Sequence, residues 1–325
     1  MKQLNEQSVA DRIASLEAEI AEKKIKFPPE IFEYVKDHFL ALQRISREGR
    51  MPTEKDMEFM EHARAWLSLD EVDRKGWLHP QQIISEYNLA AERGLSLKQW
   101  ADLCNLIKVA YSNVVHEKNT IPEAVDSVVS EFKGDGTIEI EDGFISTANP
   151  GIISLPDGLK IFGDVKINAC KNLAKLPKDF FVMGSLDASN CPLISSIPES
   201  LVVGKSIILT GTSIKIVPDS LKAVKGILFL KNCTKLKKLP DNLKVEVDLS
   251  LYGCSELKEL PKNLFVGEVL DIIDCTALER LPDDLKVDGY LYASKNLKPQ
   301  VLADAERLKL KGQIADIKYI DDPNK

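Results

Sequence analysis

The sequence predicts an α/β protein in which an all-α N-terminal region precedes a solenoid of short repeats. In residues 1–133, apolar residues recur at spacings of three and four, which is typical of amphipathic helices. From about residue 149, seven prolines follow one another at steps of 21, 21, 20, 22, 21 and 21 residues. A fixed period of this length indicates a solenoid. The prolines are Pro156, Pro177, Pro198, Pro218, Pro240, Pro261 and Pro282.

Each repeat predicts one β-strand that ends in a bend. Apolar residues alternate before the bend, as in Leu249 with Leu251 and Leu270 with Ile272, which indicates a strand with one buried face. Another apolar residue follows the bend, and an aliphatic-proline pair then ends the pairing because proline lacks the backbone donor. We expect the following apolar residues to be buried: Leu173, Leu193, Ile214, Leu236, Leu257 and Leu278.

A column of small residues stands about seven residues before the prolines. Its members are Asn149, Cys170, Cys191, Thr212, Cys233, Cys254, Cys275 and Asn296. We interpret this column as a structural ladder that fills apolar space and bonds to backbone groups. Disulfides are one alternative, since adjacent turns lie roughly 4.8 Å apart. A metal site is the other, but tetrahedral coordination needs converging thiolates rather than a parallel row, so we expect no metal.

The repeats resemble the leucine-rich repeat family. Residues 270–275, Leu-Asp-Ile-Ile-Asp-Cys, and residues 249–254, Leu-Ser-Leu-Tyr-Gly-Cys, match the second half of its pattern L-x-x-L-x-L-x-x-N/C. The first leucine is displaced, with Val245 or Val266 one place early. The short period and the recurring Leu-Pro are most similar to the bacterial subclass found in secreted effectors. The resemblance implies a solenoid of about eight turns with a parallel β-sheet on its concave face.

Three regions follow from these patterns. Residues 1–133 form a predicted helical bundle, residues 134–298 the solenoid and residues 299–325 a C-terminal cap. The cap contains a predicted helix from Pro299 to Leu310 and an alternating stretch from Gln313 to Ile320. The first helix, with Val9, Ile13, Leu16 and Ile20 on one stripe, is expected to dock on its own domain; weak self-association as a short coiled coil is the alternative.

Composition narrows the function classes. The net charge of −7 argues against a broadly basic nucleic-acid surface. No run reaches the roughly 18 apolar residues of a membrane span, and the first residues do not form a secretory signal. Cysteines of the buried type without such a signal favour a reducing compartment. We therefore expect a cytoplasmic protein; export without a cleaved signal peptide is the alternative.

Two stretches have partial EF-hand spacing. The stretch 71–78 would place Lys75 at the fifth position and Gln82 at the twelfth, and the stretch 131–142 would place Lys133 at the third. Calcium needs oxygen ligands at these positions. We therefore expect a helix-helix turn in the first stretch, and a hairpin that opens the solenoid in the second.

Apolar and aromatic residues occupy predicted solvent-facing strand positions in the later repeats. Side chains there should be polar in an idle sheet, so these residues indicate a binding surface on the concave face. The candidates are Ile208, Phe229, Lys231, Tyr252, Asp271, Ile273, Tyr290 and Tyr292. The predicted function is non-enzymatic binding of a protein partner, without a cofactor, nucleic acid or membrane. The alternatives are a bacterial secreted effector that binds host proteins, and an enzyme in the helical half, which holds all four histidines without a recognisable catalytic motif.

Overall fold

The computed structural model describes residues 80–118, 120–145 and 148–320. Its contacts divide the chain into two compact units, residues 1–101 with 133–136 and residues 102–132 with 137–325, and each is described by itself. The expectations for the helices before residue 80, for the coiled coil and for the first EF-hand-like stretch lie outside the described residues.

The described part of the first unit holds α5 (Pro80–Glu92) and the beginning of α6 (Leu97–Ala110). Gly94, at φ +66°, separates the two helices. Ser96 and Gln99 form a reciprocal cap at the start of α6, in which the Gln99 amide donates to Ser96 Oγ and the Ser96 amide donates to Gln99 Oε1. The buried Trp100 indole donates to Glu86 Oε2 at 2.6 Å.

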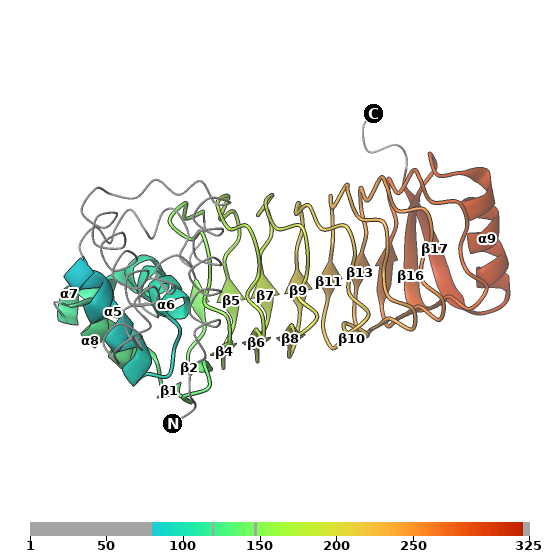
Figure 1. The fold of residues 1–325 in the computed structure, drawn as a ribbon. Coiled ribbons are helices and arrows are strands. Elements are labelled where there is room, and N and C mark those ends of the chain that lie inside the picture. Colours follow the sequence, from blue (N-terminus) through green and yellow to red (C-terminus); the bar gives the residue numbers. More distant parts are fainter. Residues whose placement is uncertain (1–79, 119, 146–147, 321–325) are drawn as a thin grey trace, which may run out of the picture. The chain divides into compact units, whose positions relative to one another are not determined.

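The second unit contains a solenoid of parallel strands with a period of about 21 residues (Figure 1). Each turn carries two short strands, which form two columns. The main column consists of β3 (Phe144–Ile145), β5 (Val165–Lys166), β7 (Leu186–Asp187), β9 (Ile207–Ile208), β11 (Leu228–Phe229), β13 (Leu249–Ser250), β15 (Val269–Asp271) and β16 (Lys286–Ser294). These eight strands bound seven full turns. Their register is regular, because each residue pairs with the residue one period later.

The second column was missed by the prediction of one strand per turn. It consists of β2 (Ile138–Ile140), β4 (Leu159–Ile161), β6 (Phe181–Val182), β8 (Val202–Val203), β10 (Ala223–Val224), β12 (Lys244–Val245) and β14 (Phe265–Val266). Its pairing is interrupted between β8 and β10, so β2, β4, β6 and β8 form a sheet with β1, and β10, β12 and β14 continue into β16. The column is formed mostly by the short segment that follows each proline. β16 pairs with both β14 and β15, so it continues both columns at the last turn.

A short corner, of three residues in most turns, joins the second strand to the main strand. Most corners carry a glycine, and at Gly267 the reason is steric. A Cβ placed there would lie 2.0 Å from the carbonyl oxygen of Glu246 in the preceding turn. Two backbone hydrogen bonds hold the turns at this spacing. The Gly267 amide donates to the Val245 carbonyl at 2.9 Å, and the Glu268 amide donates to the Val247 carbonyl at 2.9 Å.

One left-handed position recurs in seven turns and a second in four of them, and both shape the bends. The residue directly before the ladder residue has positive φ in seven turns, with the values +57° at Asn190 and +69° at Gly253. Asn, Asp and Gly tolerate this conformation best. Ala148 and Ala169 occupy the same position without that tolerance. A second such position follows the proline by two residues, as at Asn242 and Asn263. The side-chain Nδ2 of Asn263 donates to Oδ1 of Asn242 at 3.0 Å.

The core of the solenoid is mainly aliphatic. The alternating strand residues, the ladder cysteines and the aliphatic residue before each of the seven prolines are buried. One detail of the expectation is wrong: Leu193 is 52% exposed, and its neighbour Ile194 is buried instead. The buried position is the third after the cysteine, as at Leu173 and Leu236, because the bend has the same length in each of these turns.

Helices lie against the first turns of the second unit. They are the part of α6 from Asp102 onward, α7 (Ser112–Lys118) and α8 (Ile121–Val128), whose N-cap is Thr120. The Ser154 hydroxyl donates to Asp102 Oδ1 at 2.5 Å, and the Asn105 amide donates to the Gly151 carbonyl at 2.9 Å. β1 (Glu131–Phe132) pairs antiparallel with β2, so the expected hairpin is present.

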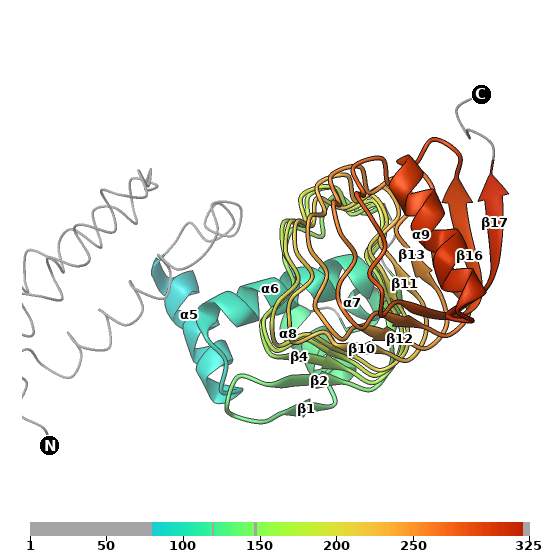
Figure 2. The ribbon, with the colours of Figure 1, turned by 90° about the vertical axis from the view of Figure 1, so that its right-hand side faces the viewer.

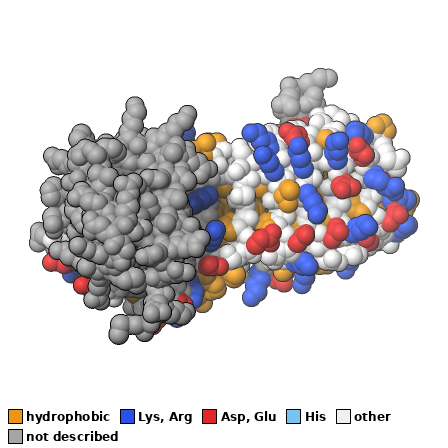
Figure 3. Space-filling view, viewed as in Figure 1, with side chains coloured by type: hydrophobic (Ala, Val, Ile, Leu, Met, Phe, Trp, Pro, Cys, Tyr) orange, Lys and Arg blue, Asp and Glu red, His pale blue; other side chains and the backbone are white. Residues whose placement is uncertain are grey.

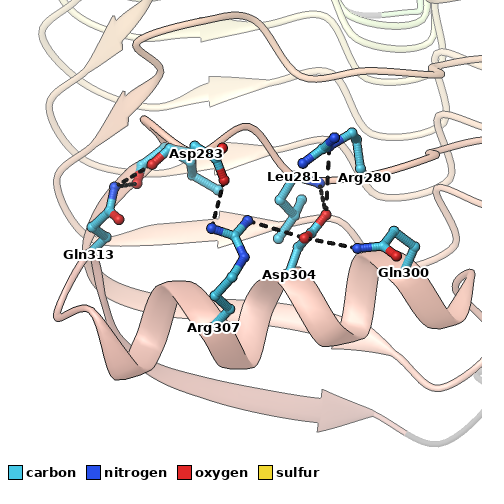
Figure 4. Close-up of polar contacts among 8 residues, drawn as sticks. Arg280, Leu281, Asp283, Gln300, Asp304, Arg307 and Gln313 are labelled. Atoms are coloured by element: carbon cyan, nitrogen blue, oxygen red, sulfur yellow. Dashed lines mark hydrogen bonds and ion pairs between the residues drawn. The ribbon is translucent and has the colours of Figure 1, made fainter.

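The other end of the solenoid is covered by α9 (Pro299–Leu310) and β17 (Ile314–Ile320). α9 buries Val301, Ala305 and Leu308, while β17 pairs in parallel with β16. Buried Asp304 accepts hydrogen bonds from the Leu281 amide, Gln300 and Arg307 at 3.0, 3.0 and 3.1 Å (Figure 4). In an earlier turn the equivalent amide of Val217 donates to the Lys238 carbonyl of the following turn. The Asp304 carboxylate therefore accepts the bond that the carbonyl of a following turn would otherwise accept from Leu281.

Candidate protein-binding face

The strand face is the side of the main column that points away from the core. Its members are the strand residues six, four and two positions before each ladder residue, and they form three rows across the turns. Eight strands at about 4.8 Å extend over roughly 34 Å. Early turns carry Lys166, Asp187 and Asn168 here, and later turns carry larger side chains.

One part of the strand face is the Phe229 cluster, which consists of Ile208, Phe229 and Lys231. Ile208 and Phe229 are direct neighbours in the register of β9 and β11. The Lys231 ammonium lies 5.0 Å from the centre of the Phe229 ring, within the range of a cation–π contact. All three side chains are half-buried. The cluster therefore offers an ordered apolar surface with a positive charge above it.

Polar side chains follow in the next two turns. The Ser250 hydroxyl donates to Asp271 Oδ2 at 2.8 Å, and the Ile273 amide donates to Asp271 Oδ1 at 3.1 Å. Tyr252 is half-buried, and its pKa is raised by burial and by the nearby carboxylates of Asp274 and Asp271. Asp271, itself half-buried, thus bonds to its own strand and its neighbour and still exposes part of its surface.

The tyrosine cluster, Tyr290, Tyr292 and Lys318, lies beyond them. The two rings have centres 6.5 Å apart and are tilted by 48°, and the Lys318 ammonium lies 5.1 Å from the centre of the Tyr290 ring. Lys318 comes from β17, where it pairs in register with Tyr292. Sequence reasoning missed Lys318, although the alternation of residues 313–320 predicted a strand, because the strand's neighbour in the sheet was not predicted.

Ile273 differs from the other proposed binding residues. The structure leaves it only 9% exposed. It lies two residues before the inward bend at Cys275, where the chain turns from the strand face toward the core. Ile273 therefore packs beneath the exposed residues of the strand face and contributes little surface to it. The remaining seven residues lie on one face and come from every turn between β9 and β16.

The ladder cysteines bond across turns. The Cys191 thiol donates to the Ile167 carbonyl, Cys233 to Leu209, Cys254 to Leu230 and Cys275 to Leu251, at 3.1–3.2 Å. Thr212 donates to the Leu209 carbonyl at 2.7 Å and lies 3.3 Å from Cys233 Sγ. All six cysteines of the chain lie in its described part, where they are buried and form no disulfide. In the described ranges, no group of three or more His, Cys, Asp or Glu is placed to hold a metal ion.

The two ends of the ladder differ from its middle. Asn149 is half-buried, and its Oδ1 accepts from the Gly151 amide at 2.9 Å. Asn296 is exposed, and its amide donates to Asp274 Oδ1 at 2.8 Å. Here the chain leaves the solenoid for α9, so the side chain turns outward. Asn296 therefore does not fill the interior position that the ladder interpretation assigned to it.

Burial governs the chemistry of the ladder thiols. It raises the pKa of Cys191 to about 11 and that of Cys275 to about 12, and it also raises those of Cys170, Cys233 and Cys254. These groups are therefore neutral thiols at pH 7, whereas the thiolate is the reactive form.

We expect the ladder thiols to be unreactive in the folded protein. Ellman's reagent at pH 7 should modify none of the five within the time in which urea-unfolded protein reacts completely, because burial blocks access and suppresses the thiolate. Absorbance at the thionitrobenzoate band measures the reaction. Rapid modification of two or more thiols, while the circular dichroism spectrum stays native, would contradict the ladder.

A different face of the solenoid is shown in Figure 3. Lysines, arginines and acidic residues alternate over it, with few hydrophobic side chains between them. After the ladder bend, Lys237 pairs with Glu256 at 3.3 Å at the rim of an open depression of about 650 Å³ that Glu259 and Arg280 also line. Mixed charge of this kind is typical of a solvated surface.

These features define the class of the second unit as a capped solenoid of parallel strands with an aromatic surface on its main strand column. Comparison with protein-family models, with curated proteins and with solved structures finds no match. Among the helices in the described residues, none has both the length and the apolar character needed to cross a bilayer.

Proposed function

We propose that the chain is a protein-interaction module of the leucine-rich repeat type and that it binds a protein partner on its strand face. The observation that carries the proposal is the placement of Phe229, Tyr252, Tyr290 and Tyr292 at strand positions that point away from the core. Partly exposed aromatic side chains with ordered geometry are typical of the centres of protein interfaces.

Pre-organisation supports the same proposal. Phe229 and Tyr290 are each held by a lysine at 5.0–5.1 Å, and Tyr252 is oriented toward carboxylates. Rings that are already ordered lose less conformational entropy on binding. The rigid ladder of the solenoid below them keeps their spacing fixed, so the face offers one defined shape to a partner.

A binding experiment tests the proposal. The intact protein is used to capture partners from a cell lysate, and a captured protein is identified by mass spectrometry and purified. Its Kd is then measured with the intact chain and with the triple variant Phe229→Ala, Tyr252→Ala, Tyr292→Ala. We expect the triple variant to bind at least about a hundredfold more weakly, since two or more central aromatic residues are removed.

A matched control removes apolar surface elsewhere. Met183, Leu193 and Ile216 are exposed, and none of them belongs to the strand face. The variant Met183→Ala, Leu193→Ala, Ile216→Ala should bind as tightly as the intact chain. If the control variant loses binding and the folded strand-face variant keeps it, the binding surface lies on another side of the protein.

A further inference from the structure

β17 is the last strand of the main column and has one open edge. Among the described residues it pairs with β16 alone. The Lys295 amide donates to the Ile320 carbonyl at 3.2 Å, so the backbone of Ile320 faces β16. Because backbone groups alternate along a strand, those of Asp316 and Lys318 also face β16, and those of Ile317 and Tyr319 point to the open edge. The start of β17 departs from this alternation, since the Val287 amide donates to the Gln313 carbonyl at 2.8 Å and the pairing with β16 shifts between Val287 and Tyr290. Figure 2 faces this end of the solenoid and shows β17 beside α9, not beneath it.

The sequence of β17 is complementary to itself in the antiparallel direction. It reads Ile-Ala-Asp-Ile-Lys-Tyr-Ile, with Ile317 at its centre. Two copies paired about Ile317 would place Asp316 opposite Lys318 in both directions. They would also place Ile317 opposite its own copy at the centre. Such pairs are the combinations that stabilise neighbouring strands.

Charge selects this register over its neighbours. A shift of the pairing by two residues in one direction would bring Asp316 opposite its own copy, and a shift in the other direction would do the same for Lys318. Like charges directly opposite each other destabilise a strand pair. The backbone groups of Ile317, which point to the open edge, also meet those of its copy only in registers of this parity, since a shift by one residue would leave their donors without acceptors.

We propose that a second copy of this chain is the partner of the open β17 edge, through antiparallel β17–β17 pairing about a twofold axis at Ile317. The contact between two short strands is small, so we expect a weak dimer with a Kd in about the micromolar range. The axis stands perpendicular to the joined sheet, which therefore continues across both copies with the two tyrosine clusters on the same side. Self-association is independent of the function proposed for the strand face.

Charge reversal tests the register. The full-length protein, Asp316→Lys and Lys318→Glu are each measured by sedimentation equilibrium at micromolar concentrations. We expect the unchanged protein to dimerise and each variant to associate about thirtyfold more weakly, because two attractive pairs become repulsive. An equimolar mixture of the two variants should form a heterodimer, since both lysines of the first variant would then lie opposite the two acids of the second. If both variants lose the dimer and their mixture recovers it, misfolding cannot be the cause, because misfolded chains would not pair when mixed.

A backbone substitution tests the edge itself. Tyr319 is exposed and its amide points to the open edge, so Tyr319→Pro removes an edge donor without removing a backbone bond to β16. This variant should be monomeric with an unchanged circular dichroism spectrum. If the unchanged protein is monomeric throughout the micromolar range, the proposal is overturned. Asp316 and Lys318 would then serve only to prevent the open edge from pairing with another chain. A dimer that persists in all three variants also overturns it, because the contact would lie elsewhere, as in the first helix.

Discussion

Replacing Gly267 with alanine is expected to lower the free energy of unfolding by about 3 kcal/mol or more. The added Cβ would lie 2.0 Å from the Glu246 carbonyl oxygen and 2.8 Å from its carbon, and both are backbone atoms that cannot rotate away. Gly267 is not in a left-handed conformation. Without the collision, alanine would stabilise the protein by restricting the unfolded chain. A loss of stability would therefore show that the two turns approach closely at Gly267, whereas a gain would show that they do not. Urea unfolding followed by circular dichroism measures it.

Lys225 provides the matched control for Gly267. It occupies the same first position of a corner two turns earlier, already carries a Cβ and is exposed. Lys225→Ala should change the free energy of unfolding by less than about 0.5 kcal/mol, as for an ordinary surface substitution. An alanine at 267 that leaves stability equal or higher would show that the turns are not packed at the distance seen in the structure.

Removing the Asp304 carboxylate is expected to cost about 3 kcal/mol of stability and to loosen the last turn first. Asp304→Ala would leave the buried Leu281 amide without an acceptor, and it would remove one of the two acids that hold Arg307. Hydrogen exchange followed by mass spectrometry should show lost protection in β16 and α9 before the earlier turns, because a solenoid opens from its end. Uniform loss along the solenoid would contradict this account.

Asp283 is the control on the same arginine. It contacts Arg307 Nη1 at 2.6 Å but is 70% exposed, whereas Asp304 is 3% exposed. Asp283→Ala should cost at most about 1 kcal/mol, as expected for an exposed ion pair. If the two substitutions cost the same, the contact with the Leu281 amide is not what makes Asp304 important.

Stability at low pH adds a second readout for Asp304. Burial by itself would raise the pKa of this carboxyl, but the bonds from Arg307, Leu281 and Gln300 outweigh burial and lower it. A lowered pKa in the folded state means that the stabilisation is present above the pKa of the unfolded chain and is lost as pH falls through the folded value. Asp304→Asn should therefore weaken the fall in stability at acidic pH.

The solenoid and its core could be predicted from the sequence because their signal repeats. The 21-residue spacing of prolines and the alternation at Leu249 and Leu251 depend only on which residues a single turn must bury. The helix at 299–310 and the strand at 314–320 follow from local periodicity in the same way. Asn190, Gly211 and Asn232 carried a further signal, the left-handed position before the ladder, which their residue types could have revealed.

Contacts between turns needed the tertiary structure. The second strand column is formed mostly by two-residue strands after the prolines, and these segments are too short to show the alternation that predicts a strand. Ile273 and Tyr252 stand at the same position in successive turns, yet only Ile273 is buried, since exposure depends on neighbouring turns. Asp304 appears in the sequence as one acid among many, and only the fold brings it to the Leu281 amide. The sequence by itself determined the repeating unit, because the residues that one turn buries are set within that turn. Only the tertiary structure decided the corners, the caps and the exposed face, because these depend on how neighbouring turns stack on one another.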